Sequence, residues 1–291
     1  MPKKDWKTII TTINTKSPTY LKNFLTSNEV FCPSKGFENV FEPSHNAFSS
    51  KHLNKPNPAN WIPIYKEDDL SDYLIENRLM PVRCGQGEFF FYRGEIVFDL
   101  RALEYDEVLV ESIESVEGFM PLTLQEFHRN ENAYLNRALA LGVLNHFLDS
   151  KSLEVFEERV ERQNYRRLLY GQFGKIKTNF ELEFKTTKGS RPINQGFQFE
   201  MDLVLENEDE IIIFEAKQGK KLRENFILLQ LYYPLIYLSA ITKKQKKIRT
   251  LFIDIETHQE QERYRLTEFC FVGGCFDEVE VLRSMLYRHN T

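Results

Sequence analysis

The 291-residue sequence contains few cysteines, and their placement argues against a domain stabilised by disulfides or by zinc. They are Cys32, Cys84, Cys270 and Cys275. Their wide and irregular spacing is typical neither of a disulfide framework nor of a CxxC zinc site. The six histidines also show no metal-ligand spacing. We therefore expect the hydrophobic core, rather than cross-links or zinc, to hold the fold.

Long apolar runs are also absent. The longest mainly apolar stretch, residues 226–241, is interrupted by Gln230 and Pro234 and is too short to span a membrane. The first residues include Lys3 and Lys4 but no apolar segment behind them, so we expect no secretory signal. These absences predict a cytoplasmic protein with no membrane association.

Excess positive charge is the third absence. The formal net charge of −5 argues against a protein that coats nucleic acid without specificity. Acidic residues outnumber basic ones in residues 1–120, whereas residues 162–249 carry an excess of Lys and Arg. These basic residues are either solvated loops and helix faces or the walls of a groove for nucleic acid.

The chain is long enough for two domains, and its patterns divide near residue 120. For residues 1–120 we predict a mixed α/β region with short helices at 6–13, 19–26 and 70–77. We also predict a β-hairpin at 88–98 that turns at Arg93-Gly94. We assign this region to target recognition or dimerisation.

Residues 121–291 are more regular. We predict helices at 131–149 and 153–170, strands at 179–184, 197–206 and 210–217, and a long helix at 223–240 that Pro234 kinks or interrupts. Strands at 249–256 and 264–272, a turn at Gly273-Gly274 and a closing helix at 278–289 complete the order. The fold class is therefore α/β, with a mixed sheet covered on both faces by helices.

The strongest local signal is a pair of β-rich runs joined by the polar segment 207–210. With a tight turn at Glu208-Asp209, Asp202 faces Glu215 and Glu200 faces Lys217, all on one side of the hairpin. Two carboxylates directly opposite each other repel and weaken a sheet. Mg²⁺ favours one or two carboxylates with water and phosphate oxygens, so a bound Mg²⁺ would remove this repulsion.

These residues resemble the PD-(D/E)XK nuclease superfamily, to which most type II restriction endonucleases belong. Asp202 followed by Glu215-Ala216-Lys217 at the end of an Ile-rich strand carries the resemblance, which covers about residues 125–275. The sequence departs from the pattern because Met201, rather than proline, precedes the first acidic residue. The resemblance implies a restriction-endonuclease-like core and a nuclease domain at 121–291. It also implies Mg²⁺ bound by Asp202, Glu215 and the Ala216 carbonyl.

Two further residues match features of this superfamily. Glu131, at the start of the predicted helix, either reaches the metal site or only complements the helix dipole. Gln230 either supports the active site or is a polar residue on a helix flank. Lys217 would orient or activate the attacking water, and Glu200 would tune Lys217 or hold a second metal ion.

The implied activity is Mg²⁺-dependent hydrolysis of DNA phosphodiester bonds by a sequence-specific type II restriction endonuclease. The predicted DNA contacts are Lys220, Lys221, Arg223, Lys188 and Arg191. The implied partners are double-stranded DNA, a second copy of the chain in a homodimer, and a companion DNA methyltransferase. The alternatives are a structure-specific repair or recombination nuclease of the same superfamily, a DNA-binding protein without catalysis, and an unrelated α/β enzyme.

Overall fold

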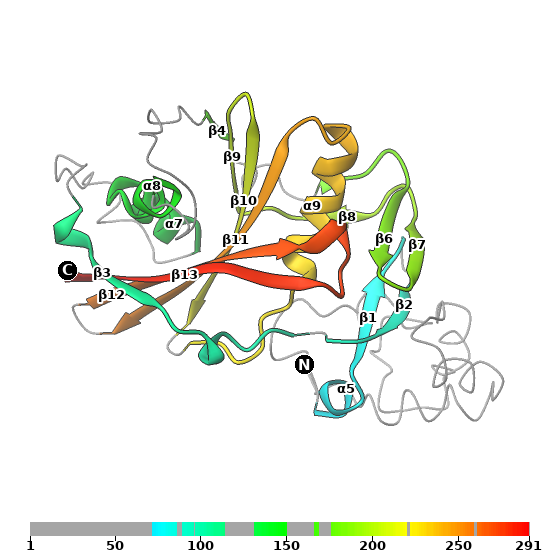
Figure 1. The fold of residues 1–291 in the computed structure, drawn as a ribbon, viewed down its shortest axis with the longest axis horizontal. Helices are drawn as coiled ribbons and strands as arrows, with labels where there is room; N and C mark the ends of the chain where they lie inside the picture. The colour runs from blue at the N-terminus through cyan, green and yellow to red at the C-terminus, as the bar shows by residue number, and fades with distance from the viewer. Residues whose placement is uncertain are drawn as a thin grey trace, which may run out of the picture. The chain divides into compact units, whose positions relative to one another are not determined.

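The computed structural model describes residues 72–85, 89–95, 97–113, 131–149, 166–168, 176–219, 222–258 and 261–290. The chain forms two compact units, each assembled from several segments (Figure 1). Unit 1 comprises Met1–Phe98, Lys177–Gln198 and Asn225–Leu228, and unit 2 comprises Asp99–Ile176, Phe199–Glu224 and Leu229–Thr291. This division is not contiguous, unlike the predicted boundary at residue 120. None of the described helices is long and apolar enough to cross a membrane.

The described residues of unit 1 form two small antiparallel sheets and one helix. Its elements are α5 (Asp72–Glu76), β1 (Leu79–Arg83), β2 (Phe89–Arg93), β6 (Leu182–Thr186) and β7 (Gly189–Ile193). The ring of Phe184 lies 5.3 Å from that of Phe90 and 5.7 Å from that of Tyr92, so aromatic packing holds β6 against β2. The predicted helix at 70–77 and the predicted strand at 179–184 are confirmed as α5 and β6. The helices predicted at 6–13 and 19–26 lie outside the described residues.

The β-hairpin predicted at 88–98 is wrong. β2 pairs antiparallel with β1, from Leu79↔Arg93 to Arg83↔Phe89, so Arg93-Gly94 ends a strand rather than forming a turn. β1 is almost entirely buried and pairs with β2 along its whole length, so β2 has a partner other than the residues that follow it. The backbone of Phe98 pairs instead with that of Phe226, in an isolated bridge.

Unit 2 is built on a mixed seven-stranded sheet in the order β3-β13-β12-β11-β10-β9-β4. The strands are β3 (Asp106–Leu109), β4 (Arg166–Leu168), β9 (Leu203–Glu206), β10 (Glu210–Gly219), β11 (Lys247–His258), β12 (Gln261–Phe271) and β13 (Val279–Asn290). The pairs β10-β11 and β13-β3 are parallel and the others antiparallel. The predicted α/β class with a mixed sheet is confirmed. The short strands β5 (Ile176–Lys177) and β8 (Gln198–Phe199) lie where the chain passes from one unit to the other.

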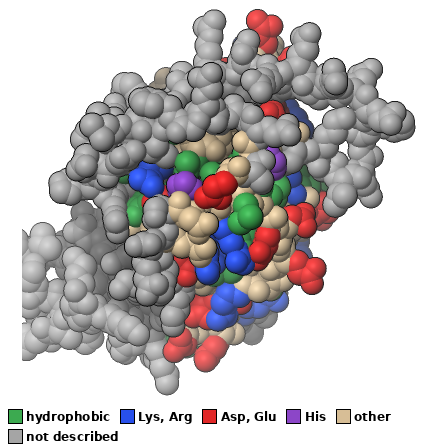
Figure 2. Space-filling view, turned by 90° about the vertical axis from the view of Figure 1, so that its left-hand side faces the viewer, with side chains coloured by type: hydrophobic (Ala, Val, Ile, Leu, Met, Phe, Trp, Pro, Cys, Tyr) green, Lys and Arg blue, Asp and Glu red, His purple; other side chains and the backbone are tan. Residues whose placement is uncertain are grey.

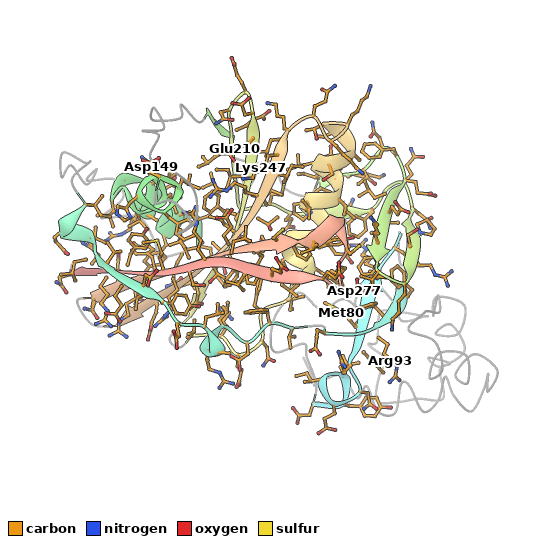
Figure 3. The ribbon with its side chains drawn as sticks, in the orientation of Figure 1. Met80, Arg93, Asp149, Glu210, Lys247 and Asp277 are labelled. Carbon is orange, nitrogen blue, oxygen red and sulfur yellow. The ribbon has the colours of Figure 1, made fainter. Side chains whose placement is uncertain are left out.

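Helices lie on both sides of the central strands, as predicted. Figure 1 shows α7 (Glu131–Ala140) and α8 (Val143–Asp149) on one side of β9–β11 and α9 (Leu229–Ile241) on the other. Ile212, Phe214 and Ala216 of β10 join the core beneath α7 and α8. Ile211 and Ile213 are equally buried on the opposite side, because side chains alternate along a strand. Figure 3 shows Glu210 and Lys247 together where the parallel strands β10 and β11 begin.

The closing helix predicted at 278–289 is wrong, because this segment is the strand β13, drawn as the red arrow in Figure 1. β13 pairs with β12 from Gln261↔Asn290 to Phe271↔Val279 and with β3 along its other edge. These non-local pairings outweigh the local helical spacing of the apolar residues. The 3-10 turn Val272–Gly274 joins β12 to β13, and Gly273 and Gly274 have φ of 60° and 74°. The predicted turn is therefore confirmed.

Two predicted helices also need correction. The helix predicted at 131–149 is divided between α7 and α8 by Gly142, whose φ of 72° ends the first helix. In the helix predicted at 153–170, residues 166–168 form the strand β4, which pairs with β9. The remainder of that segment lies outside the described residues. The helix predicted at 223–240 begins only at Leu229 as α9, which runs through Pro234 without interruption.

The edge strand β3 is joined to β13 by ion pairs as well as by backbone bonds. Arg288 on β13 forms an ion pair with Glu107 on β3 at 2.5 Å, and a ring nitrogen of His289 lies 3.2 Å from Glu111 in the turn that follows β3. Short 3-10 turns, Leu100–Ala102 and Val110–Ser112, lie on either side of β3. Figure 2 shows acidic and basic side chains intermixed on the side of unit 2 that carries the ends of these strands. This face has no patch of a single charge sign among the residues that are described.

A buried ion cluster joins β11, β12 and β13 on the α8 side of the sheet. Glu268 accepts hydrogen bonds from Arg249 at 2.7 and 2.9 Å and from Arg283 at 2.8 Å. The Arg283 guanidinium lies 4.0 Å from the centre of the Phe147 ring in α8. Burial raises the pKa of Glu268, but the hydrogen bonds and charges of the arginines lower it more, so this carboxylate is ionised at neutral pH.

We expect Glu268→Gln to lower the free energy of unfolding by about 2–3 kcal/mol, because buried charges then lose their counter-charge. Urea denaturation followed by circular dichroism measures this change. The exposed Glu280 on β13 offers a matched Glu→Gln control, which we expect to alter stability by less than about 0.5 kcal/mol. Equal effects of the two substitutions would contradict the assignment of Glu268 as a structural ion.

Candidate active site

The hairpin β9-β10 has the predicted register. Its ladder runs from Ile211↔Glu206 to Phe214↔Leu203, and Glu208-Asp209 forms the two-residue loop. The amide of Asn207 donates to the Glu210 carbonyl at 3.1 Å, and the Asn207 side-chain oxygen accepts from the amides of Asp209 and Glu210. Asn207 therefore closes the turn as an Asx motif.

Asp202 lies next to Leu203, which forms the last pair of this ladder. Its Oδ2 accepts a hydrogen bond from the backbone amide of Ala216 at 2.8 Å. A side-chain carboxylate thus takes the place of the next backbone partner of β10. The bond holds Asp202 beside Glu215, the residue that the register predicts opposite to it.

The ammonium group of Lys217 lies close to several oxygen atoms. Its Nζ lies 2.5 Å from Glu215 Oε1 and 3.0 Å from the carbonyl oxygen of Ala216. The side chains of Glu215 and Lys217 are 8% and 19% exposed, so this ion pair is largely shielded from water. An ion pair of this kind is strong only where further polar groups surround it.

Glu131 supplies such a group from a distant part of the chain. It is the first residue of α7, and its Oε1 lies 4.0 Å from Lys217 Nζ. Its side chain is 41% exposed, so it marks the side of the cluster that is open to solvent. Of the two roles considered for Glu131, its position suits a contribution to the cluster.

The electrostatics of the cluster are dominated by burial. The pKa of Glu215 is raised to about 8, chiefly by burial and also by the charges of Asp202 and Glu131, against the opposing charge of Lys217. Burial lowers the pKa of Lys217, but Glu215, Asp202 and Glu131 raise it more, so Lys217 stays charged. Three carboxylates around one ammonium group leave the cluster with excess negative charge when all are ionised.

This donor set fits Mg²⁺. Asp202, Glu215 and the Ala216 carbonyl offer hard oxygen ligands, and the Lys217 ammonium already lies among two of them. In the described part of the chain, no three His, Cys, Asp or Glu side chains are grouped so that they could hold a metal ion by themselves. Mg²⁺ commonly takes only one or two carboxylates and completes its shell with water and phosphate oxygens.

The other predicted site residues are placed differently. Glu200 is exposed, and the β9-β10 ladder ends before it, so strand pairing does not bring it to Lys217. Gln230 is partly buried in the first turn of α9. Lys188 and Arg191 are exposed on the β6-β7 hairpin of unit 1. Lys220 and Lys221 lie outside the described residues.

The Arg223 side chain contacts other residues of unit 2. Its Nη2 donates to the carbonyl oxygen of Gln218 at 2.9 Å, and its Nε lies 3.5 Å from Asp254 Oδ1. Sequence reasoning missed Asp254 and its neighbour Glu256 on β11. The alternation of acidic and apolar residues in Ile253-Asp254-Ile255-Glu256 was the available signal, because a carboxylate in a buried central strand requires a partner.

The fold and the site define an α/β protein with a carboxylate–lysine cluster at the end of a central β-hairpin. The chain belongs to the family described as "Domain of unknown function (DUF6997)", which matches residues 93–288. This range includes Glu131, Asp202, Glu215 and Lys217. No curated protein and no solved structure was found to match the chain.

Proposed function

We propose that this protein is a Mg²⁺-dependent endonuclease that hydrolyses DNA phosphodiester bonds, and specifically a type II restriction endonuclease acting on double-stranded DNA. The observation that carries the proposal is the convergence of Asp202, Glu215 and Lys217 at the end of the hairpin. A buried carboxylate whose pKa is raised beside a second carboxylate is costly for the fold. Binding of a divalent cation explains why such a pair is present.

In this proposal, Asp202, Glu215 and the Ala216 carbonyl hold Mg²⁺. When bound, Mg²⁺ polarises the phosphate and lowers the pKa of a water molecule. Lys217 contributes a positive charge 2.5 Å from Glu215, where it can orient the attacking water and stabilise charge that develops on the phosphate oxygens. Glu131, at the open side of the cluster, would add a further carboxylate near Lys217.

Exposed basic side chains would hold the DNA backbone. Lys243, Lys244 and Lys247 are exposed in unit 2, at the turn between α9 and β11. Lys188 and Arg191 would serve the same purpose in unit 1. Phosphate contacts of this kind provide affinity and orientation, whereas sequence specificity requires contacts to base edges. A homodimer would supply the two active sites that duplex cleavage needs.

The test is incubation of the purified protein with plasmid and phage DNA in the presence and absence of Mg²⁺. We expect cleavage with Mg²⁺ and none after EDTA, and restoration when excess Mg²⁺ is added back, because the buried carboxylates hold the cation. Discrete bands would support a restriction enzyme. Cleavage of branched but not linear DNA would favour the structure-specific alternative. Binding of DNA without cleavage under any of these conditions would overturn the catalytic proposal.

A further inference from the structure

Lys217 begins a row of charged residues that crosses three neighbouring strands. In the sheet register Lys217 on β10 lies beside Asp254 on β11, which lies beside Arg265 on β12. Neighbouring strands are about 4.8 Å apart, well within reach of a lysine side chain. Asp254 is therefore a natural ion-pair partner for Lys217. Lys217 nevertheless points toward Glu215, the Ala216 carbonyl and Glu131.

Lys217 does not pair with Asp254 because two arginines already lie beside the Asp254 carboxylate. Asp254 has a side chain only 1% exposed, and Arg223 Nε and Arg265 Nη1 lie 3.5 and 3.3 Å from its two oxygen atoms. Arg265 is shared, because its Nη2 donates to Glu256 at 2.6 Å, whereas the other arginine near Glu256, Arg263, lies 3.8 Å away. Asp254 consequently depends on Arg223 for full neutralisation. The charge of Arg223 also lowers the pKa of Asp254, which burial raises to about 6.

Arg223 also holds the backbone next to Lys217. Its Nη2 donates to the carbonyl oxygen of Gln218, the residue that follows Lys217 in β10. The amide of Leu100 in turn donates to the carbonyl oxygen of Arg223 at 3.1 Å, which anchors the segment that carries the guanidinium. One side chain thus connects the end of β10 to the buried carboxylate of β11.

We propose that Arg223 is a positioning residue that neutralises Asp254 and so leaves Lys217 directed into the Asp202–Glu215 cluster. Without Arg223, Asp254 attracts the Lys217 ammonium across the β10-β11 pair and draws it away from Glu215. The effect on catalysis rests on the proposed nuclease function, whereas the placement of Lys217 does not. This role differs from the predicted DNA contact of Arg223, because it acts through Lys217 rather than on phosphate.

The first test compares single-turnover cleavage by the wild type, Arg223→Gln, Arg223→Lys and the double variant Arg223→Gln/Asp254→Asn at pH 8. We expect Arg223→Gln to lower the rate at saturating DNA on the order of 100-fold, with little change in the DNA concentration needed for half-saturation. Arg223→Lys retains the charge and most of the rate. The double variant recovers the rate, because the uncompensated carboxylate is gone.

The second test follows Lys217 itself and does not need cleavage. In protein labelled with carbon-13 at lysine Cε, the Lys217 signal is the one that disappears in Lys217→Met. We expect this signal to shift in Arg223→Gln and to return toward its wild-type position in the double variant. If the wild type cleaves no DNA, the nuclease proposal fails while this measurement still decides the position of Lys217.

Two results would overturn the positioning role. One is an unchanged Lys217 signal in a folded Arg223→Gln variant. The other is a loss in Arg223→Gln that appears as weaker, more salt-sensitive DNA binding and is not recovered by Asp254→Asn, since a phosphate contact predicts that outcome. Misfolding of Arg223→Gln that Asp254→Asn does not correct also counts against the proposal, because it assigns Arg223 to stability alone.

Discussion

Replacement of Lys217 by methionine is expected to reduce the rate of Mg²⁺-dependent DNA cleavage by about 1000-fold, because preorganised charge at the reacting phosphate is commonly worth this much. Methionine preserves most of the side-chain volume but removes the ammonium group that contacts Glu215 and the Ala216 carbonyl. The rate is measured under single-turnover conditions with saturating protein. Asp202→Asn is expected to cause a similar loss, because it removes one proposed ligand.

The controls separate catalysis from folding and DNA binding. Asp209→Asn is a matched substitution in the exposed loop of the same hairpin, and it should leave the rate unchanged. Fluorescence anisotropy with labelled DNA in Ca²⁺ should give similar affinities for the wild type and Lys217→Met. Full cleavage activity in Lys217→Met would show that Lys217 takes no part in the reaction.

The second large effect concerns pH. Because the pKa of Glu215 is raised from 4.5 to about 8 in the folded protein, the folded state binds a proton more tightly than the unfolded state between these values. The free energy of unfolding should therefore fall as pH rises from about 5 to 8. Each tenfold change in proton affinity is worth about 1.4 kcal/mol, so the Glu215 contribution amounts to several kcal/mol.

Urea denaturation at a series of pH values without divalent cations measures this dependence. Glu215→Gln, which resembles the protonated side chain, should flatten the profile between pH 5 and 8. Glu208→Gln, an exposed change in the hairpin loop, should leave it as in the wild type. Added Mg²⁺ should stabilise the wild type most at high pH, where Glu215 is ionised and available as a ligand. Identical profiles for wild type and Glu215→Gln would contradict the assigned burial effect.

Elements whose contacts are close in the chain were predicted more accurately than elements that depend on distant partners. The register and turn of the hairpin β9-β10 were predicted correctly, because its two strands are adjacent in the chain and a two-residue turn determines their register; the predicted pairing of Glu200 with Lys217 was wrong, because the ladder ends at Leu203. The strands β11 and β12 were predicted from their composition. β13 was mistaken for a helix, because its character comes from pairing with β12 and β3.

The same distinction applies to the candidate site. Asp202, Glu215 and Lys217 belong to one hairpin, so their alternation along two strands sufficed to place them together. Arg223 was assigned to DNA because it follows the strand, yet in the structure it contacts Asp254. Local sequence spacing predicts a partner on the adjacent strand of a hairpin, but not one on a strand that is distant in the chain, such as β11.

The sequence by itself determined the carboxylate–lysine hairpin, since a short turn leaves only one register for its strands. Only the tertiary structure decided which other charges surround it. Packing of α7 on the sheet brings Glu131 within 4.0 Å of Lys217, and the parallel pairing of β10 with β11 places Asp254 beside Lys217. These contacts join residues that are far apart in the chain, so they form only when the sheet and its helices assemble around one core.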